Sequence, residues 1–542
     1  MGKIVVHGRV KVRTTAEQEE IKKVERAKKV AEYKAGMNLV FQKRRDKIYD
    51  DELLLVTERI VVKNPDIYTL WNIRREAFNA NDWSNEEREI RMKKDLSLTE
   101  CCLRENPKSY YVWHHRCWVI ERLSEPDWET ELALCAKCLN YDERNFHCWE
   151  YRLFVVQKAG ISDEEEFNFS TTKILNNFSN YSSWHYRSKV LSKMFPDNTG
   201  ALPIRSDKHK EELDLVMNAT FTDPNDSSAW FYQRWLLDSH KSINNPIWRA
   251  QLTSTAATVV FHKDVAINSL NLNILVDGTN IPLNWESHDN AKFAKVWSTP
   301  PNEIFINLND DMDGETFTCK INIESQEKHN LNQLQEQLES YQQLIQMEPH
   351  NKWALLTGIF LMRNINDSKY HKNILENFTA LKTIDKLRSN YYEDLRSKYL
   401  IDYVLHNTWL QEDKTNEVTS LDMSNYNLTL LCNEHYLSFY SEVNLCGNNL
   451  GNSLHRLHSL QRCKKLSLSC NGIKSLEQFP TLFSLKVLLL RYNELSSVDE
   501  ILELVKRHRL ITLDIRENLV CMVNGIVQAI SEVSPDTTVL TD

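Results

Sequence analysis

The chain has 542 residues, of which 42% are hydrophobic and 26% are charged, and this composition is typical of a folded protein with several domains. Its net charge of −9 argues against a nucleic-acid-binding surface over the whole chain. The sequence contains no apolar run of the length of a transmembrane helix, and the N-terminus does not resemble a signal peptide. We therefore expect a cytoplasmic protein.

The 12 cysteines are scattered along the chain, and in a reducing compartment we expect free thiols that pack as small apolar side chains. Cys135 and Cys138 form a C-x-x-C pair inside a helical pattern. Zinc sites built on this motif usually need a second pair. Core packing is therefore the better explanation.

Residues 17–47 predict a charged amphipathic helix with a solvated face. Five copies of an aromatic signature follow, each beginning with Asn or Asp and ending on Trp seven positions later: NPDIYTLW at 64–71, NPKSYYVW at 106–113, DERNFHCW at 142–149, NFSNYSSW at 177–184 and DPNDSSAW at 223–230. The tryptophans are 42, 36, 35 and 46 residues apart, which leaves room for two helices per copy. We predict a mainly α protein with an α-solenoid of helical hairpins over residues 1–242.

Most residues of the signature have a structural explanation. Proline after the first Asn stops the preceding helix, and Ser109, Asn145 and Ser182 are predicted to cap the next one. The tryptophans, and the Tyr or Phe that stands three residues before four of them, are predicted to pack between adjacent helices.

Charged and titratable residues also recur beside the tryptophans. An arginine follows each one, at Arg74, Arg116, Arg152, Arg187 and Arg234. Because a catalytic residue is needed once, this repetition predicts salt bridges between helices. In the fifth copy Gln233 takes the usual place of the arginine, so the register there stays open. The nearby histidines are predicted to be interface or core residues with one ring nitrogen bonded: His114, His115, His147 and His185.

Between residues 243 and 325 the hydrophobic pattern changes to period two, at 304–308 and again at 317–323. Asp-Gly pairs at 277–278 and 313–314 are typical of hairpin turns. We predict an inserted β-sandwich of immunoglobulin-like type, although topology does not follow from the pattern.

A helical pattern resumes after the insert, and a degenerate sixth copy around Trp353 continues the helical domain over residues 326–412. The region 413–542 then has a period of about 22 residues. Its five copies are LDMSNYNL at 421–428, VNLCGNNL at 443–450, LSLSCNGI at 466–473, LLLRYNEL at 488–495 and LDIRENLV at 513–520. Asn occupies the sixth position in four of them, and Tyr426 in the first. The pattern predicts leucine-rich repeats, in which the Asn amide bonds the turn backbone, and hence a binding surface.

The segments around the five tryptophans resemble the repeat of the protein prenyltransferase alpha subunits. The order of helical repeats, β insert and leucine-rich repeats resembles the Rab geranylgeranyltransferase branch of that family in particular. This resemblance implies an alpha subunit that wraps around a beta subunit built as an α-α barrel. It further implies that the beta subunit carries the zinc ion and the lipid pocket.

The reaction implied by the resemblance is transfer of a geranylgeranyl group from geranylgeranyl diphosphate to C-terminal cysteines of Rab GTPases, with a Rab escort protein presenting the acceptor. The zinc ion would activate the acceptor cysteine as a thiolate. The chain itself has no H-E-x-x-H motif and no paired Cys motifs with zinc spacing. We therefore expect it to be active only with a beta subunit.

The resemblance implies two catalytic residues in this chain. Lys108 stands where the family's alpha subunits supply a lysine to the isoprenoid diphosphate, and a cation there stabilises charge on the leaving group. Tyr110 stands where a tyrosine lines the same edge of the site. From the residues alone, the better explanation is that Lys108 is a solvated lysine at a helix start and Tyr110 a packing aromatic.

His7 is a third candidate, since the family's alpha subunits begin near M-H-G-R and this chain has V-H-G-R at 6–9 after a five-residue extension. An N-terminal histidine can reach the zinc of the beta subunit and inhibit the enzyme. The alternative hypothesis for the whole chain is a non-enzymatic scaffold that binds protein partners. Irregular tryptophan intervals argue against a tetratricopeptide scaffold, which keeps a 34-residue period.

Overall fold

The computed structural model describes residues 16–198, 202–237, 331–411, 420–451 and 453–541, together with short segments between residues 247 and 319. The chain divides into two compact units, Met1–His240 and Lys241–Asp542. Within the described ranges, every helix is too short or too polar to span a bilayer.

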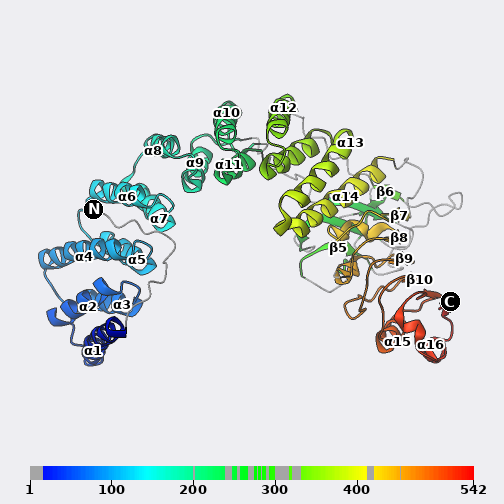
Figure 1. Cartoon of the computed structure of the whole chain (residues 1–542), viewed down its shortest axis with the longest axis horizontal. Helices are drawn as coiled ribbons and strands as arrows, with labels where there is room; N and C mark the ends of the chain where they lie inside the picture. Colours follow the sequence, from blue (N-terminus) through cyan, green and yellow to red (C-terminus); the bar gives the residue numbers. More distant parts are fainter. Residues whose placement is uncertain are drawn as a thin grey trace. The chain divides into compact units, whose positions relative to one another are not determined.

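The first unit is a series of helical hairpins that follow one another in chain order (Figure 1). Helix α1 is followed by the hairpins α2–α3, α4–α5, α6–α7, α8–α9 and α10–α11. The bounds are α1 Ala16–Arg45, α2 Asp51–Lys63, α3 Tyr68–Ala80, α4 Asn85–Glu105, α5 Tyr110–Ile120, α6 Trp128–Tyr141, α7 Phe146–Ala159, α8 Asp163–Asn176, α9 Tyr181–Met194, α10 Ser206–Thr222 and α11 Ser227–Leu237. The signature in each copy is the turn between the two helices and the first turn of the second.

The fixed spacing of the signature has a physical cause. Each repeat tryptophan is buried, and its indole N–H donates a hydrogen bond to the backbone carbonyl six residues earlier, in the turn. The pairs are Trp71 with Pro65 at 2.8 Å, Trp113 with Pro107 at 2.9 Å, Trp149 with Glu143 at 2.9 Å, Trp184 with Phe178 at 2.7 Å and Trp230 with Pro224 at 3.0 Å. The prediction that these tryptophans are core residues is confirmed.

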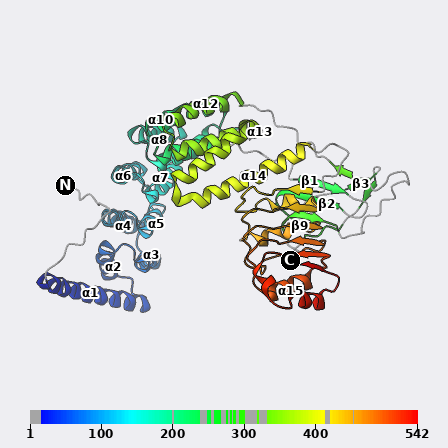
Figure 2. The same ribbon diagram turned by 45° about the vertical axis from the view of Figure 1, so that its right-hand side comes forward.

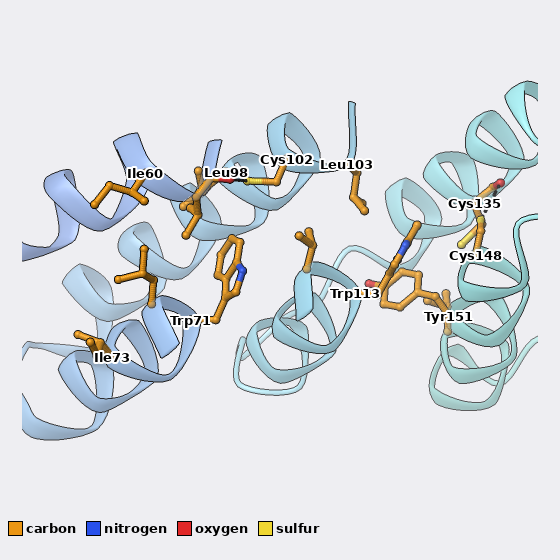
Figure 3. Packing of buried hydrophobic residues seen from close by; sticks show 14 of the residues in the cluster. Ile60, Trp71, Ile73, Leu98, Cys102, Leu103, Trp113, Cys135, Cys148 and Tyr151 are labelled. Atoms are coloured by element: carbon orange, nitrogen blue, oxygen red, sulfur yellow. Dashed lines mark hydrogen bonds between the residues drawn. The ribbon is translucent and has the colours of Figure 1, made fainter. Parts of the chain in front are cut away.

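The prediction that the Tyr or Phe three residues before four of the tryptophans is also buried between helices is wrong. The rings of four tryptophans, Trp71, Trp113, Trp149 and Trp184, pack against an aromatic ring of the following hairpin, two residues after that hairpin's own tryptophan. Trp113 and Tyr151, for example, have centroids 5.1 Å apart (Figure 3). The aromatic residue three positions before the tryptophan is instead exposed, as at Tyr110, which is 62% exposed. This residue begins the helix, where its side chain leaves the core.

Buried ion pairs join the helices, as the repeated arginines predict. Arg116 donates to both carboxylate oxygens of Glu131 at 2.7 and 2.6 Å, and the Tyr151 hydroxyl donates to the same carboxylate at 2.7 Å. Equivalent buried pairs are Arg74 with Asp95, Arg152 with Glu166 and Arg187 with Glu212. In the fifth copy the buried position belongs to Gln233, and Arg234 is exposed. The one-residue shift of the arginine places it on the solvent side of α11.

Of the predicted helix caps, Asn145 is confirmed, because its side chain accepts from the backbone N–H groups of His147 and Cys148. Ser182 is wrong: Asn180 caps α9 and accepts from the backbone of Ser182. The helix begins two residues earlier than a cap at Ser182 would require, so Asn180 stands in the cap position. Ser109 occupies the cap position of α5, but its hydroxyl donates to the Pro65 carbonyl of the preceding copy at 3.4 Å.

The second unit begins with short antiparallel strands. A four-stranded sheet has the order β5-β2-β1-β6, and β3 and β4 form a separate two-stranded sheet. The bounds are β1 Ile247–Leu252, β2 Ala257–Val265, β3 Ile274–Val276, β4 Thr279–Ile281, β5 Ala294–Ser298 and β6 Phe317–Cys319. Val276 pairs with Thr279 across the predicted 277–278 turn. The predicted turn at 313–314 and the alternating residues at 304–308 and 320–323 lie outside the described residues.

Three helices and a parallel sheet complete this unit (Figure 2). The helices are α12 Leu331–Met347, α13 Lys352–Ile384 and α14 Ser389–Gln411. The sheet has the order β12-β11-β10-β9-β8-β7, with bounds β7 Ser420–Asp422, β8 Glu442–Asn444, β9 Lys465–Ser467, β10 Val487–Leu489, β11 Thr512–Asp514 and β12 Thr538–Leu540. The short helices α15 Val498–Arg507 and α16 Ile526–Val533 connect its last strands.

Buried asparagines hold the turns after the parallel strands. Asn493, for example, accepts from the backbone N–H groups of Asn471 and Ile473 at 3.0 Å and donates to the carbonyls of Leu468 and Leu490. Asn448, Asn471 and Asn518 make comparable bonds to turn backbone. The amides therefore satisfy backbone groups that no strand partner reaches.

Candidate functional site

Lys108 lies in the turn between α4 and α5. Its backbone N–H donates to the side chain of Asn106 at 3.1 Å, and Asn106 is the C-cap residue of α4. The ammonium nitrogen lies 3.1 Å from a carboxylate oxygen of Asp142, the C-cap residue of α6 in the next hairpin. The Lys108 side chain is 59% exposed, so its charge remains accessible to a ligand.

The backbone of this turn is repeated, whereas the side chain at the position of Lys108 is not. In every copy the first residue of the signature accepts a hydrogen bond from the backbone N–H two residues later. The residues that donate this N–H, in the order of the five copies, are Asp66, Lys108, Arg144, Ser179 and Asn225. Arg144 is also cationic, but its guanidinium donates to the Ser179 carbonyl of the next copy at 2.8 Å.

Tyr110 is the first residue of α5 and stands two positions after Lys108 in the sequence. Its ring lies edge-on to the ring of His147, with centroids 4.1 Å apart and an interplanar angle of 85°. It also contacts Phe146, at a centroid distance of 5.8 Å. Tyr110 therefore links the start of α5 to the start of α7 while keeping most of its surface exposed.

His147 is buried beneath Tyr110. Burial lowers the pKa of its imidazole, a nearby Glu150 opposes the shift, and the charge on Lys108 lowers the pKa further. The imidazole is accordingly neutral at neutral pH, so Lys108 supplies the positive charge of this group.

Exposed aromatic residues continue along the same ends of the second helices. This aromatic row consists of Tyr68, Tyr110, Tyr111, Phe146, Tyr181 and Phe231, each between 41% and 62% exposed. Neighbouring hairpins contribute rings in contact, as in Tyr68 with Tyr111 and Tyr181 with Phe231. Large exposed apolar groups in a series are typical of an interaction surface.

The site can bind an anion next to an apolar surface. Lys108, whose side chain is 59% exposed, and Tyr110, which is 62% exposed, both belong to the second copy, where the family resemblance implies the catalytic residues. In the part of the chain that the structure describes, no group of three His, Cys, Asp or Glu side chains is arranged to hold a metal ion. His7 lies outside the described residues.

Sequence reasoning missed Asp142 and Phe146 as neighbours of Lys108 and Tyr110. The sequence did contain a signal for these contacts. Asp142 and Phe146 belong to the signature of the next copy, and the equivalent turns of adjacent hairpins lie side by side. His147 was expected only as an interface or core residue.

The other histidines have structural roles. His115 is fully buried, bonds Asp95 at 2.9 Å and takes the place that tyrosine occupies in the later copies. A ring nitrogen of His114 lies 2.8 Å from the Arg75 guanidinium, and His185 stacks on Tyr181. One bonded ring nitrogen is therefore confirmed for His114 and His115.

The fold and the site define a helical-repeat protein whose hairpin turns carry an exposed aromatic row and a lysine suited to an anionic ligand. The model of the protein prenyltransferase alpha subunit repeat matches residues 92–123, 128–159, 163–194 and 209–240. The geranylgeranyl transferase type-2 subunit alpha of Homo sapiens is 36% identical over 574 residues, covering 98% of this chain and 99% of that protein.

The protein of the same name from Saccharomyces cerevisiae is 37% identical over 241 residues, covering 43% of this chain and 72% of that protein. A solved structure of Candida albicans protein geranylgeranyltransferase-I complexed with GGPP covers 68% of this chain and 90% of that chain, with 17% identity and a TM-score of 0.42. The full-length similarity decides the family: this chain belongs to the geranylgeranyl transferase type-2 alpha subunits.

Proposed function

We propose that this chain is the alpha subunit of a heterodimeric Rab geranylgeranyltransferase. The enzyme transfers a geranylgeranyl group from geranylgeranyl diphosphate to C-terminal cysteines of Rab GTPases that an escort protein presents. Family membership supports this function over that of a non-enzymatic scaffold. The observation that carries the role of this chain is the exposed ammonium of Lys108. It stands at a position of the turn that is occupied by a different residue in every copy.

Lys108 binds the diphosphate and stabilises the negative charge that builds on it as the bond to the lipid breaks. A cation held in place before the reaction needs little reorganisation in the transition state. Asp142 holds the Lys108 ammonium at 3.1 Å in the free subunit, and the diphosphate competes with it for this cation. Tyr110 lines the same edge and orients the diphosphate through its hydroxyl.

The beta subunit covers the aromatic row and supplies the rest of the site. The contact is apolar at the rings, and Lys108 lies at its edge. In this arrangement the zinc ion belongs to the beta subunit, where it supplies thiolate activation of the acceptor cysteine. We also propose the inhibitory contact of His7 with that zinc, which predicts higher activity for His7→Ala.

For the second unit we propose an immunoglobulin-like sandwich at 243–325 and leucine-rich repeats at 413–542, with the helical domain continuing over 326–412 between them. Two antiparallel sheets support the sandwich. Parallel strands that alternate with asparagine-bonded turns support the leucine-rich repeats. Both would serve protein partners rather than the reaction.

The test is co-expression with a geranylgeranyl transferase type-2 beta subunit, followed by prenyl transfer to an escort-bound Rab GTPase. Lys108→Ala is expected to lower turnover about 100-fold, the effect of removing one transition-state donor, whereas Lys108→Arg keeps the charge and loses less. Tyr110→Phe is expected to have a smaller effect.

Lys193→Ala is the matched control, because Lys193 forms an exposed pair with Asp163 at 2.7 Å away from the turn. Equal turnover in the Lys108→Ala and Lys193→Ala enzymes would overturn the role of Lys108. Activity of the isolated chain would overturn the division of labour with the beta subunit.

A further inference from the structure

Strand β10 places an apolar stripe on the outward face of the parallel sheet. Successive residues of a strand point to opposite faces, and Leu488 and Leu490 are fully buried, whereas Val487 and Leu489 are partly exposed. The neighbouring strands β9 and β11 pair with β10 in register (Figure 1). Their residues in the same two outward rows are polar: Lys465, Ser467, Thr512 and Asp514.

Arg491 follows this stripe on the same face, two positions after Leu489. Its backbone carbonyl accepts from the N–H of Cys470 at 2.9 Å, so the hydrogen bonding of the sheet extends to it. The guanidinium lies 4.7 Å from the centroid of the Tyr492 ring and donates to the Tyr492 hydroxyl at 3.3 Å. Among the described residues, none forms an ion pair with Arg491, and its Nε has no hydrogen-bond acceptor. A guanidinium has five N–H donors, so most of them are available to an anion.

Arg516 stands at the equivalent position of the next repeat, beside Arg491. The backbone N–H of Tyr492 donates to the Arg516 carbonyl at 3.0 Å. The Arg516 guanidinium donates to both carboxylate oxygens of Asp514 at 2.9 and 2.7 Å. These bonds lower the pKa of Asp514, burial opposes the shift, and the charge of Arg491 lowers the pKa further. Because Arg516 already balances the charge of Asp514, Arg491 gives this face an excess positive charge.

We propose that the outward face of β9, β10 and β11 binds an acidic segment of a protein partner. A carboxylate of the segment pairs with Arg491, and its apolar side chains pack on Val487 and Leu489. A guanidinium binds a carboxylate through two parallel hydrogen bonds, and arginine is enriched in protein interfaces. Curved repeat arrays commonly bind their partners on such a face.

The charge along the sheet determines where the segment binds. At the other end of the sheet, β7 and β8 expose Asp422 and Glu442. These carboxylates repel an acidic segment, whereas Arg491 attracts it. The segment is therefore directed to β10. This assignment rests on the protein-binding role proposed for residues 413–542 and specifies the chemistry of the partner.

The experiment measures fluorescence anisotropy of a fluorescein-labelled peptide of two Leu-Leu-Glu-Glu repeats, added to the full-length chain at low ionic strength. The peptide is expected to bind, and Arg491→Ala is expected to weaken binding about tenfold, the loss of one charge-assisted contact. Val487→Asp should weaken it by about as much, because a carboxylate replaces part of the apolar stripe. Lys474→Ala is the matched control, since Lys474 is exposed outside the outward rows and pairs with Glu494 at 3.4 Å.

A second peptide with Gln in place of Glu keeps the apolar residues and is expected to bind about tenfold more weakly than the acidic peptide. Equal binding of the two peptides would overturn the acidic character of the partner. Displacement of the acidic peptide by equimolar inorganic phosphate would overturn the peptide in favour of a small anion.

The unaltered chain decides the proposal even if a variant folds poorly. No change of anisotropy on adding the acidic peptide to it would overturn the surface. Equal affinities of the Arg491→Ala and Lys474→Ala chains would overturn the role of Arg491. None of these measurements needs prenyl transfer, so failure here would leave the role of Lys108 in the proposed reaction intact.

Discussion

Both the helical hairpins at 51–237 and the parallel sheet at 420–540 are arrays of repeats that bury polar side chains at equivalent positions. The kind of polar group that is buried differs between them. The hairpins bury ion pairs: Arg116 and Glu131 are each less than 5% exposed and form two hydrogen bonds. The sheet buries neutral amides, of which Asn493 makes four hydrogen bonds to backbone.

The difference follows from what each polar group must satisfy. In the hairpins the backbone is satisfied within each helix, so the buried pair links side chains of two helices and depends on both charges. In the sheet the turns leave backbone N–H and carbonyl groups without partners, and the amide supplies both a donor and an acceptor. The hairpin array should therefore be sensitive to charge and pH, and the sheet to loss of hydrogen bonds.

The largest expected effect is that of Arg116→Met. It leaves the Glu131 carboxylate buried without its cation, and such a loss costs about 3–5 kcal/mol of the free energy of unfolding. Urea unfolding monitored by tryptophan fluorescence measures it, because nine of the 14 tryptophans lie between residues 71 and 235. Arg104→Met is the control, since Arg104 forms an exposed pair with Glu100 and should cost under about 0.5 kcal/mol. Similar costs for the two variants would contradict the importance of burial.

The next effect is that of Asn493→Ala in the sheet. It leaves backbone groups at 468–490 unsatisfied and should cost about 2–3 kcal/mol. Hydrogen exchange of peptides from residues 466–495 should accelerate, while peptides of α6 and α7 stay protected. Asn449→Ala is the control, because Asn449 is exposed. Equal acceleration in both variants would mean that the amide is dispensable.

As the pH falls, the hairpins should lose stability at a higher pH than the asparagine-bonded turns of the sheet do. Burial opposes ionisation of Asp95, but the charge of Arg74 and the hydrogen bond from His115 lower its pKa from 3.8 to about 2. This stabilisation, about 2 kcal/mol, is present above pH 3.8 and is lost as the pH falls through about 2. Burial also lowers the pKa of His115, so below pH 6.5 the unfolded state binds a proton that the folded state excludes.

Both groups therefore make the hairpin array less stable as the pH falls. Urea midpoints from tryptophan fluorescence, measured between pH 7 and pH 3, should decrease steadily. Unchanged midpoints over that range would show that the Arg74, Asp95 and His115 group contributes nothing to the pH dependence.

The smallest effect on stability is expected for Lys108→Ala. The pair with Asp142 is half-exposed, and pairs of this kind contribute under about 1 kcal/mol. The melting temperature should therefore stay within about 2 °C of that of the unaltered chain. A large loss of stability would place Lys108 among the repeated structural residues and weaken its assignment to the reaction.

Much of the hairpin array could be predicted from the sequence because its signals are local. The tryptophan, the helix-stopping proline and the turn asparagine act within eight residues, so each copy carries its own turn. The repetition of the arginines correctly indicated salt bridges, but not their acidic partners, which stand 14 to 25 residues further along with no fixed spacing.

The candidate site was harder to predict because it joins consecutive copies. Asp142 reaches Lys108 across 34 positions of sequence, and Tyr110 meets His147 across 37, so neither contact produces a periodic pattern within one copy. Ser182 shows a limit at short range: the helix starts two residues earlier than the predicted cap implied, and Asn180 caps it.

The bond from each tryptophan to the carbonyl six residues earlier sets where the chain can change length. It closes a loop that lies wholly within one turn and the start of one helix, so inserting a residue there would pull the indole off its acceptor. In the described residues of the first helices and of the links between hairpins, no tryptophan makes such a bond. The intervals between tryptophans vary from 35 to 46 residues, whereas the seven-residue step within each signature does not vary. Insertions are therefore tolerated between the signatures and not within them.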